Sequence, residues 1–184
     1  MATQIPLELV EAAINGTPDS LERLVEVIWP VAYRLSLAIV GEPQGAEDAA
    51  QESCVIVCRI IGTLRKTAAF RAWLYRIVVR QASALKRQKM WSETVSESVP
   101  YYVDETSAID VSQALSRLSK KLREVVVLRY FEDLSSQEIG TILGVPSATV
   151  RFRLMTAKRR LRPLLDDTPQ HDVAVEEKVR FHAI

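Results

Sequence analysis

The sequence predicts an all-α protein made of two small helical domains joined by a flexible acidic linker. Apolar residues recur at helical spacing through most of the 184 residues, and no stretch alternates with period two for long enough to predict a strand. Charge is distributed in blocks, although the formal net charge is only +1. These observations divide the chain into a first domain (1–91), a linker (92–110), a four-helix domain with a helix-turn-helix (111–165) and an acidic tail (166–184).

Four helices are expected in the first domain. Glycines supply the stop signals between them, and Pro30 predicts a kink inside the second helix. On the fourth helix six apolar residues share one face, and Trp73 among them is interpreted mainly as a core residue. The expected spans are Leu7–Ile14, a helix capped by Asp19 or Ser20 that ends near Val40, about Pro43–Ile61, and a helix capped by Thr67 that ends near Trp91.

The second domain carries a more specific pattern. A short helix, a glycine-containing turn and a longer basic helix predict a helix-turn-helix, whose second helix enters the major groove of DNA. Ser135 and Glu138 form a capping-box sequence at the start of the short helix. The expected elements are Leu115–Leu118, Leu122–Phe131, a helix from the capping box to Gly144, the turn Val145-Pro146, and a long helix capped by Ser147.

Two faces are predicted on this long helix. The buried stripe comprises Val150, Leu154, Ala157 and Leu161. An exposed Phe and Met among arginines suit a surface that meets thymine methyl groups and guanine edges, and packing against a protein partner is the alternative. The residues of this opposite face are Ala148, Phe152, Met155, Thr156 and Arg159, with Arg151 and Arg153 at its flanks.

Two blocks of positive charge are separated by an acidic spacer. Residues 59–89 contain nine bases and no acid, whereas residues 92–113 contain five acids and no base. Residues 114–165 are basic again, with 11 bases and four acids, and the tail is acidic. This pattern favours two polyanion-binding surfaces over one uniform fold, although charge runs are also typical of solvated faces.

Several classes of protein are not expected. No stretch approaches the ~18 consecutive apolar residues of a membrane-spanning helix. A secretory signal begins with basic residues, and this sequence has none before Arg23, so such a signal is not expected. Cys54 and Cys58 have no nearby His, so a zinc site is not expected, and both are interpreted as small core residues. The sequence has no phosphate-binding glycine loop and no catalytic constellation. We therefore expect a cytoplasmic protein that is not an enzyme and holds no cofactor or metal.

Three segments carry a resemblance to a known family. Ala46–Glu52 is similar to the start of a region 2.2 helix, and Phe70–Ile77 is similar to an F-x-x-W-L-Y-R-I segment. Leu122–Arg129 followed by Leu134–Pro146 is similar to a region 4 domain. In this order the segments resemble the extracytoplasmic-function (ECF) sigma factors, the promoter-specificity subunits of bacterial RNA polymerase. The resemblance covers about residues 21–165 and implies recognition of two promoter elements and strand opening at initiation.

The resemblance also implies partners. A coiled coil of the polymerase's largest subunit is expected to bind the third helix through Asp48, Gln51, Glu52 and Val55. The alternative is that Glu47 and Asp48 only complement the helix dipole in the first turn. The flap region of core polymerase, promoter DNA and an anti-sigma factor are the other expected partners, and the linker would thread the polymerase's RNA channel.

Two DNA surfaces follow from the resemblance together with the chemistry of the side chains. The minus-ten element is assigned to Arg65, Lys66, Arg76, Arg80, Ser83 and Arg87. The minus-thirty-five element is assigned to Arg151, Phe152 and Thr156 for bases, with Arg153, and to Ser147, Thr149, Lys158 and Arg159 nearer phosphates. The chain departs from the common family residues at Arg80, Ala84, Phe152 and Thr156, so its base preference stays open.

A helix-turn-helix regulator that binds operators independently of polymerase is the alternative function. It leaves the acidic residues 47–52 and the basic residues 62–89 without a role. The acidic tail has two interpretations, a disordered end or a regulatory element that competes with DNA for the basic helix. Its acids are Asp166, Asp167, Asp172, Glu176 and Glu177.

Overall fold

The computed structural model describes residues 4–93 and 111–165, and every regular element in these ranges is a helix. The all-α prediction is confirmed. None of these helices is both long and apolar enough to cross a membrane. The elements are α1 (Leu7–Ile14), α2 (Ser20–Val40), α3 (Pro43–Ile60), the 3-10 turns η1 (Ile61–Thr63) and η2 (Thr67–Ala69), α4 (Phe70–Glu93), α5 (Val111–Ser116), α6 (Lys120–Tyr130), α7 (Ser136–Leu143) and α8 (Ser147–Leu165).

The ends of α2 show how local sequence sets a helix boundary. Gly41 adopts a left-handed conformation with φ of 92°, and its N–H donates to the Leu37 carbonyl. At the other end the predicted cap differs, because the Asp19 side chain accepts no capping hydrogen bond. The Ser20 hydroxyl instead donates to the Thr17 carbonyl at 2.5 Å. The start of α2 is therefore fastened to the preceding turn.

The buried face of α4 agrees with the predicted core. Phe70, Leu74 and Val78 are buried, whereas Trp73 and Leu85 are half-buried at the margin of the core. The ring centroids of Phe70 and Trp73 lie 5.8 Å apart. This apolar face packs α4 against α2 and α3.

The prediction for the two cysteines is half wrong. Cys54 is buried and Cys58 is exposed. The buried stripe of α3 passes through Ala50, Cys54 and Val57, and Cys58 is rotated by ~100° from Val57. Burial raises the pKa of the Cys54 thiol to about 11, with a smaller contribution from Cys58.

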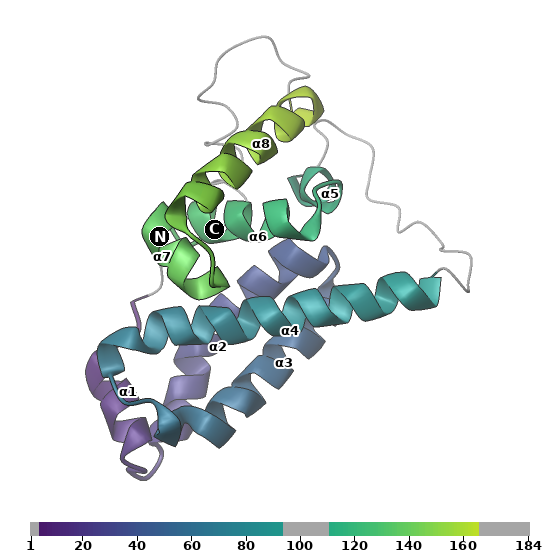
Figure 1. The fold of residues 1–184 in the computed structure, drawn as a ribbon. Helices are drawn as coiled ribbons and strands as arrows, with labels where there is room; N and C mark the ends of the chain where they lie inside the picture. Colours follow the sequence, from purple (N-terminus) through teal and green to yellow (C-terminus); the bar gives the residue numbers. More distant parts are fainter. Residues whose placement is uncertain (1–3, 94–110, 166–184) are drawn as a thin grey trace.

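Two groups of helices pack against each other in this structure. α4 lies between a first helical group, which it forms with α1–α3, and a second helical group, α5–α8 (Figure 1). It contacts α2 and α3 on one side and α7 on the other, while α2 also contacts α5 and α6. Apolar residues of both groups form one continuous core. The sequence analysis did not predict this packing. The predicted linker from residue 94 onward, and the predicted tail, lie outside the described residues.

Candidate nucleic-acid and polymerase interface

The turn between α7 and α8 sets the direction of α8. Gly144 ends α7 in a left-handed conformation with φ of 67°. A Cβ atom on Gly140 would lie 2.6 Å from the carbonyl oxygen of Val145, so only glycine lets the chain turn this closely. The Val145 N–H donates to the Gly140 carbonyl at 3.0 Å. α8 then begins at Ser147 itself, so Ser147 is the first helical residue and not the predicted cap.

The capping box at the start of α7 is present as predicted. The Glu138 N–H donates to the Ser135 hydroxyl oxygen at 3.3 Å, and the Ser135 N–H donates to the Glu138 carboxylate at 2.8 Å. The Ser135 hydroxyl also donates to this carboxylate at 2.7 Å. These bonds lower the pKa of Glu138 below its ordinary value.

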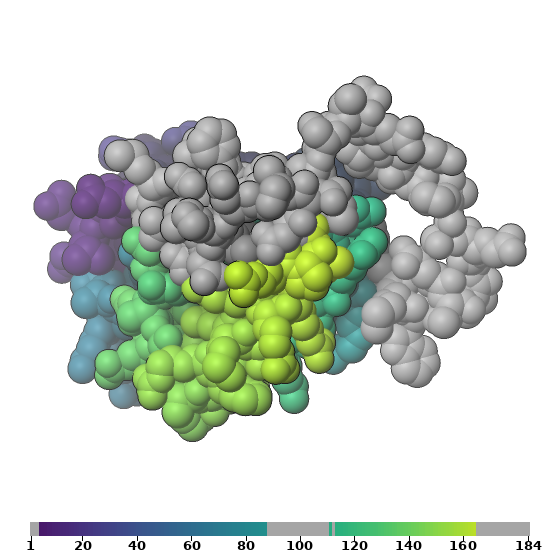
Figure 2. All heavy atoms as spheres, turned by 90° about the horizontal axis from the view of Figure 1, so that it is seen from above, coloured from purple at the N-terminus to yellow at the C-terminus, as the bar shows by residue number. Residues whose placement is uncertain are grey.

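The two faces of α8 also agree with the sequence analysis. Val150, Ala157 and Leu161 are buried, and Leu154 is half-buried. On the opposite face the side chains of Phe152 and Met155 are 64% and 61% exposed. Figure 2, seen from the α8 side, shows the light green and yellow atoms of α7 and α8 at the surface of the molecule.

The polar residues predicted on α8 vary in exposure. Arg151, Lys158 and Arg159 are exposed, and Arg153 is half-buried. Ser147, Thr149 and Thr156 are half-buried, and the Thr156 hydroxyl donates to the Phe152 carbonyl at 2.9 Å. A basic rim therefore surrounds an apolar centre on this face.

The residues predicted for the minus-ten element fall into two sets. Arg65, Lys66, Arg76, Arg80 and Arg87 are exposed on the α3–α4 connection and on α4, whereas Ser83 is buried. Arg76 donates to the carbonyls of Thr141 and Ile142, at 2.5 Å and 3.1 Å, at the end of α7. Ser83 is 3% exposed and donates to the Glu124 carboxylate at 2.8 Å. In this conformation Ser83 cannot contact DNA, because α6 covers it. Its predicted role requires α6 to move away.

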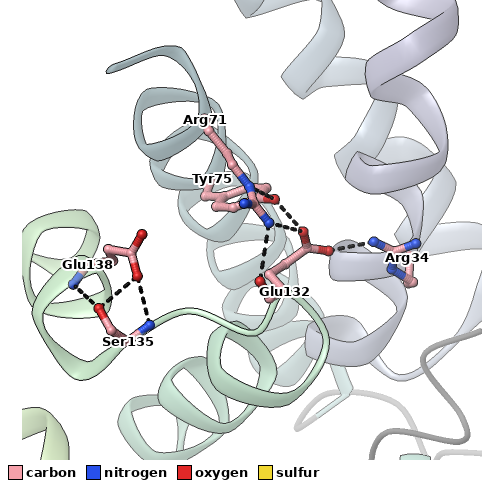
Figure 3. Close-up of polar contacts among 6 residues, drawn as sticks. All are labelled: Arg34, Arg71, Tyr75, Glu132, Ser135 and Glu138. Carbon is pink, nitrogen blue, oxygen red and sulfur yellow. Dashed lines mark hydrogen bonds and ion pairs between the residues drawn. The ribbon is translucent and has the colours of Figure 1, made fainter. Parts of the chain in front are cut away.

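A buried carboxylate connects the two helical groups (Figure 3). Glu132 follows α6, and its side chain is fully buried. Arg34 on α2 donates to it at 2.6 Å, and the Tyr75 hydroxyl on α4 donates a short hydrogen bond to its other oxygen. Arg71 on α4 lies 3.6 Å from the same oxygen and donates to the Glu132 main-chain carbonyl at 3.2 Å. We call these four residues the Glu132 cluster.

The environment of the Glu132 cluster shifts the pKa of two of its members. Burial raises the pKa of Tyr75, and the negative charge of Glu132 raises it further. Burial alone would lower the pKa of Arg71, but hydrogen bonding to Tyr75 and the charges of Tyr75 and Glu132 raise it overall. The arginine therefore stays positively charged at any pH at which the protein is folded.

Sequence reasoning missed Arg34 and Glu132, because 98 positions separate them along the chain. The available signal was a pair of acids, Glu132 and Asp133, between two apolar residues inside an otherwise basic domain. An acid in such a place is a candidate for burial against a cation from elsewhere in the fold.

Arg123 was also missed as a structural residue. It is 4% exposed and donates to the carbonyls of Leu115, Ser116 and Leu118, which fastens the α5–α6 corner. It also donates to the Ile39 carbonyl of α2 at 2.9 Å. Burial lowers its pKa, although Glu124 opposes this shift.

The acidic side chains of α3 lie on its solvent face. Asp48, Gln51 and Glu52 are exposed, and Val55 is half-buried beside them. Glu42 caps the helix by accepting a hydrogen bond from the Gly45 N–H at 2.8 Å, and the first turn contains no acid. Asp48 therefore lies beyond the first turn, where the helix dipole has less influence. The alternative, in which Glu47 and Asp48 only complement the helix dipole, required them to lie in the first turn, and they do not.

Known families match both helical groups. Residues 21–92 match the family described as Sigma-70 region 2, and residues 108–161 match Sigma-70, region 4. The RNA polymerase sigma factor SigV of Bacillus subtilis is 33% identical over 135 residues, which are 71% of this chain and 81% of SigV. The ECF RNA polymerase sigma factor SigM of Mycobacterium tuberculosis is 31% identical over 163 residues, which cover 86% of this chain and 83% of SigM.

A solved structure agrees with the fold. CnrH, in a complex with the cytosolic domain of CnrY, superimposes with a TM-score of 0.67 at 24% identity, covering 88% of this chain and 98% of CnrH. This likeness concerns the fold alone. The two family matches, the identity to curated sigma factors and the helix-turn-helix geometry agree with one another. The chain belongs to the ECF family of RNA polymerase sigma factors.

Proposed function

We propose that three surfaces divide the work of this sigma factor at a promoter. The acidic face of α3 docks on core polymerase, α4 and the loop before it engage the minus-ten element, and α8 engages the minus-thirty-five element. The observation that carries the proposal is the exposed α8 face, where Phe152 and Met155 lie among arginines beyond a closed helix-turn-helix corner. Two large apolar side chains exposed on one helix face indicate an interaction surface.

On α8 the proposed roles follow from reach and chemistry. Arg151 and Phe152 contact base edges, since a guanidinium can bond bidentately to guanine and an aromatic side chain can contact a thymine methyl group. Lys158 and Arg159 contact phosphates and contribute affinity without sequence preference. Both pairs are exposed on the same helix.

On α3 the proposed contact is electrostatic. Three exposed polar residues, Asp48, Gln51 and Glu52, lie near the half-buried Val55, which gives a polar surface with a small apolar centre. Asp48→Arg is expected to abolish capture of core polymerase while the far-ultraviolet circular dichroism spectrum stays unchanged. Unchanged capture of core enzyme would contradict the docking proposal.

Three further features are proposed from membership of the family. The chain acts as a non-catalytic subunit, it works in the cytoplasm, and an anti-sigma factor is among its partners. We also propose that residues 92–110 and 166–184 act as linker and tail.

The function is tested by run-off transcription with purified core polymerase on a promoter library. We expect specific transcripts only when the chain is added, and start sites that share two upstream elements. The alternative, a regulator that acts without polymerase, predicts specific operator binding by the chain alone and no transcripts from core enzyme plus chain.

A further inference from the structure

We propose that α1 holds the connection between α3 and α4 in the conformation that reads the minus-ten element, and that Val10 is the positioning residue. The connection comprises residues 61–69 and contains η1 and η2. This inference rests on the proposed function in one respect, namely that the connection engages this element. It adds a role for α1, which lies outside the region 2 match that begins at residue 21.

The connection has a covered side and an exposed side. Every third residue is covered by the protein, and this spacing matches the three residues per turn of a 3-10 helix. The covered residues are Ile61 and Phe70, which are buried, and Leu64 and Thr67, which are half-buried. All residues between them are exposed, including the basic pair Arg65 and Lys66. Packing of the covered side therefore sets how the other side is presented to DNA.

Hydrogen bonds inside the connection are local. The Leu64 N–H donates to the Ile61 carbonyl at 2.9 Å, and the Ala69 N–H donates to the Lys66 carbonyl at 3.0 Å. Each bond joins residues three positions apart, so it shapes one turn without attaching that turn to the rest of the domain. The attachment of the covered side has to come from packing.

The first helix supplies this packing. α1 contacts both η1 and η2, whereas α3 contacts η1 and α4 contacts η2 as their neighbours in the chain (Figure 1). α1 also contacts α2. Val10 and Ala13 are the buried residues of α1, and Val10, the larger of the two, is fully buried. α1 therefore lies against both the connection and α2.

The corner between α1 and α2 is itself held by hydrogen bonds. The Thr17 N–H donates to the Ala12 carbonyl at 3.0 Å, and the Ser20 N–H donates to the Thr17 carbonyl at 3.2 Å. Val10 belongs to the same apolar core as Leu24 and Ile28 of α2. The connection is thus attached to the longest buried face of the first helical group through α1.

A held connection should discriminate between bases better than a loose one. A loose segment loses conformational entropy when it becomes ordered on DNA. It can also rearrange to accept more than one base, as flexible binding surfaces do. We therefore expect α1 to contribute to base discrimination at the minus-ten element, although Val10 is buried and cannot contact DNA.

The decisive comparison uses two valine-to-alanine variants of the full chain. Val10→Ala removes two methyl groups from α1, and Val31→Ala makes the same change at a fully buried residue of α2. Nuclear magnetic resonance measures amide hydrogen exchange at Leu64 and Ala69 in the free chain. Run-off transcription with core polymerase, on single-base variants of a promoter selected from the library, measures base discrimination at each of the two elements.

For Val10→Ala we expect the Leu64 and Ala69 amides to exchange about tenfold faster, because these hydrogen bonds open by local release of the connection. Discrimination at the minus-ten element should fall by a comparable factor, while discrimination at the minus-thirty-five element and capture of core polymerase stay unchanged. For Val31→Ala we expect wild-type values in all these measurements, although its global stability falls as well. Leu64→Ala loosens the connection from its own covered side and should give the same result if Val10→Ala folds poorly.

Three results would overturn the inference: unchanged exchange at Leu64 and Ala69 in Val10→Ala, equal effects of Val10→Ala and Val31→Ala, or equal loss of discrimination at both promoter elements. Failure of the proposed function would look different. The wild-type chain would then show no base preference at the minus-ten element, whereas hydrogen exchange in the free chain would still decide whether α1 holds the connection.

Discussion

The two arginine-rich helices, α4 and α8, differ in what the rest of the chain packs against them. On α8, Arg151 and Phe152 are exposed beside the helix-turn-helix corner. On α4, Arg76 is exposed but bonded to the end of α7, and Ser83 is buried beneath α6. The residues of a basic helix face indicate what kind of partner the face can bind. Whether each of these residues is free to bind that partner depends on the helices packed against the face.

The physical origin of this difference is position in the fold. α4 is central and lies between α2 and α3 on one side and the second helical group on the other (Figure 1). α8 packs on α5, α6 and α7 through its buried stripe, and its opposite face is exposed. A central helix has fewer directions open to solvent, so a polar side chain on its covered side, such as Ser83, bonds to the protein, while Arg80 and Arg87 stay exposed.

Among the predictions that test this difference between α4 and α8, the largest expected effect is the loss of stability in the Arg123→Met variant. Four main-chain carbonyls accept hydrogen bonds from this buried guanidinium, one of them in α2. Removing it takes a donor from all four carbonyls, of which Ile39 keeps Lys86 and Leu115 keeps the Leu118 N–H. The loss should lower the free energy of unfolding by ~3–5 kcal/mol, measured by urea denaturation. The second helical group, which both covers α4 and carries α8, would be loosened.

Arg129→Met is the matched control for this experiment. Arg129 is half-buried and donates to the Leu134 carbonyl at 2.9 Å. A loss of ~1 kcal/mol is expected for this variant. If both variants lost the same free energy of unfolding, the four hydrogen bonds of Arg123 would stabilise the fold no more than the one hydrogen bond of Arg129.

The next effect sharpens the α8 side of the comparison. Arg151→Ala should weaken promoter binding by the polymerase complex by ~1–3 kcal/mol and relax the preference at one base pair. Lys158→Ala should weaken binding to all sequences about equally. Binding to a set of single-base promoter variants separates these outcomes, and identical profiles for both variants would refute the division between base and phosphate contacts.

A smaller effect is expected from the capping box that orients the short helix of the helix-turn-helix. Ser135→Ala removes the hydroxyl that accepts from the Glu138 N–H and should cost ~1 kcal/mol of unfolding free energy. Ser136→Ala, one residue later in the first turn of α7, is the control and should cost less. Thermal unfolding of both variants tests the difference.

The smallest effect is a pH dependence from the same box. Because hydrogen bonds from Ser135 lower the pKa of Glu138, the folded state holds its proton less tightly than the unfolded state. The stabilisation is therefore complete above the ordinary Glu pKa of ~4.3 and declines as the pH falls through the lower folded pKa. Urea denaturation between pH 6 and 3 should show this decline, and Glu138→Gln should diminish it. Because Glu138 is exposed, the effect should be small.

Errors of the sequence analysis at single residues have local geometric causes. Asp19 precedes α2 as expected, but in a left-handed conformation its side chain does not reach the free N–H groups. Cys58 was assigned to the core from its residue type, yet it lies one helical step from the buried stripe. In both cases the direction in which one side chain points decided whether the prediction was right, and residue type alone does not specify that direction.

The sequence by itself determined the helical elements, the capping box, the two faces of α8 and the family. These features depend on residues within a few positions of each other, such as Ser135 and Glu138, or on repeats of 3.6 residues. Only the tertiary structure decided which basic side chains bond to distant parts of the chain. These bonds, from Arg34 to Glu132 and from Arg76 to Thr141, join residues 98 and 65 positions apart. Such pairings arise from the packing of whole helices, which no local pattern specifies.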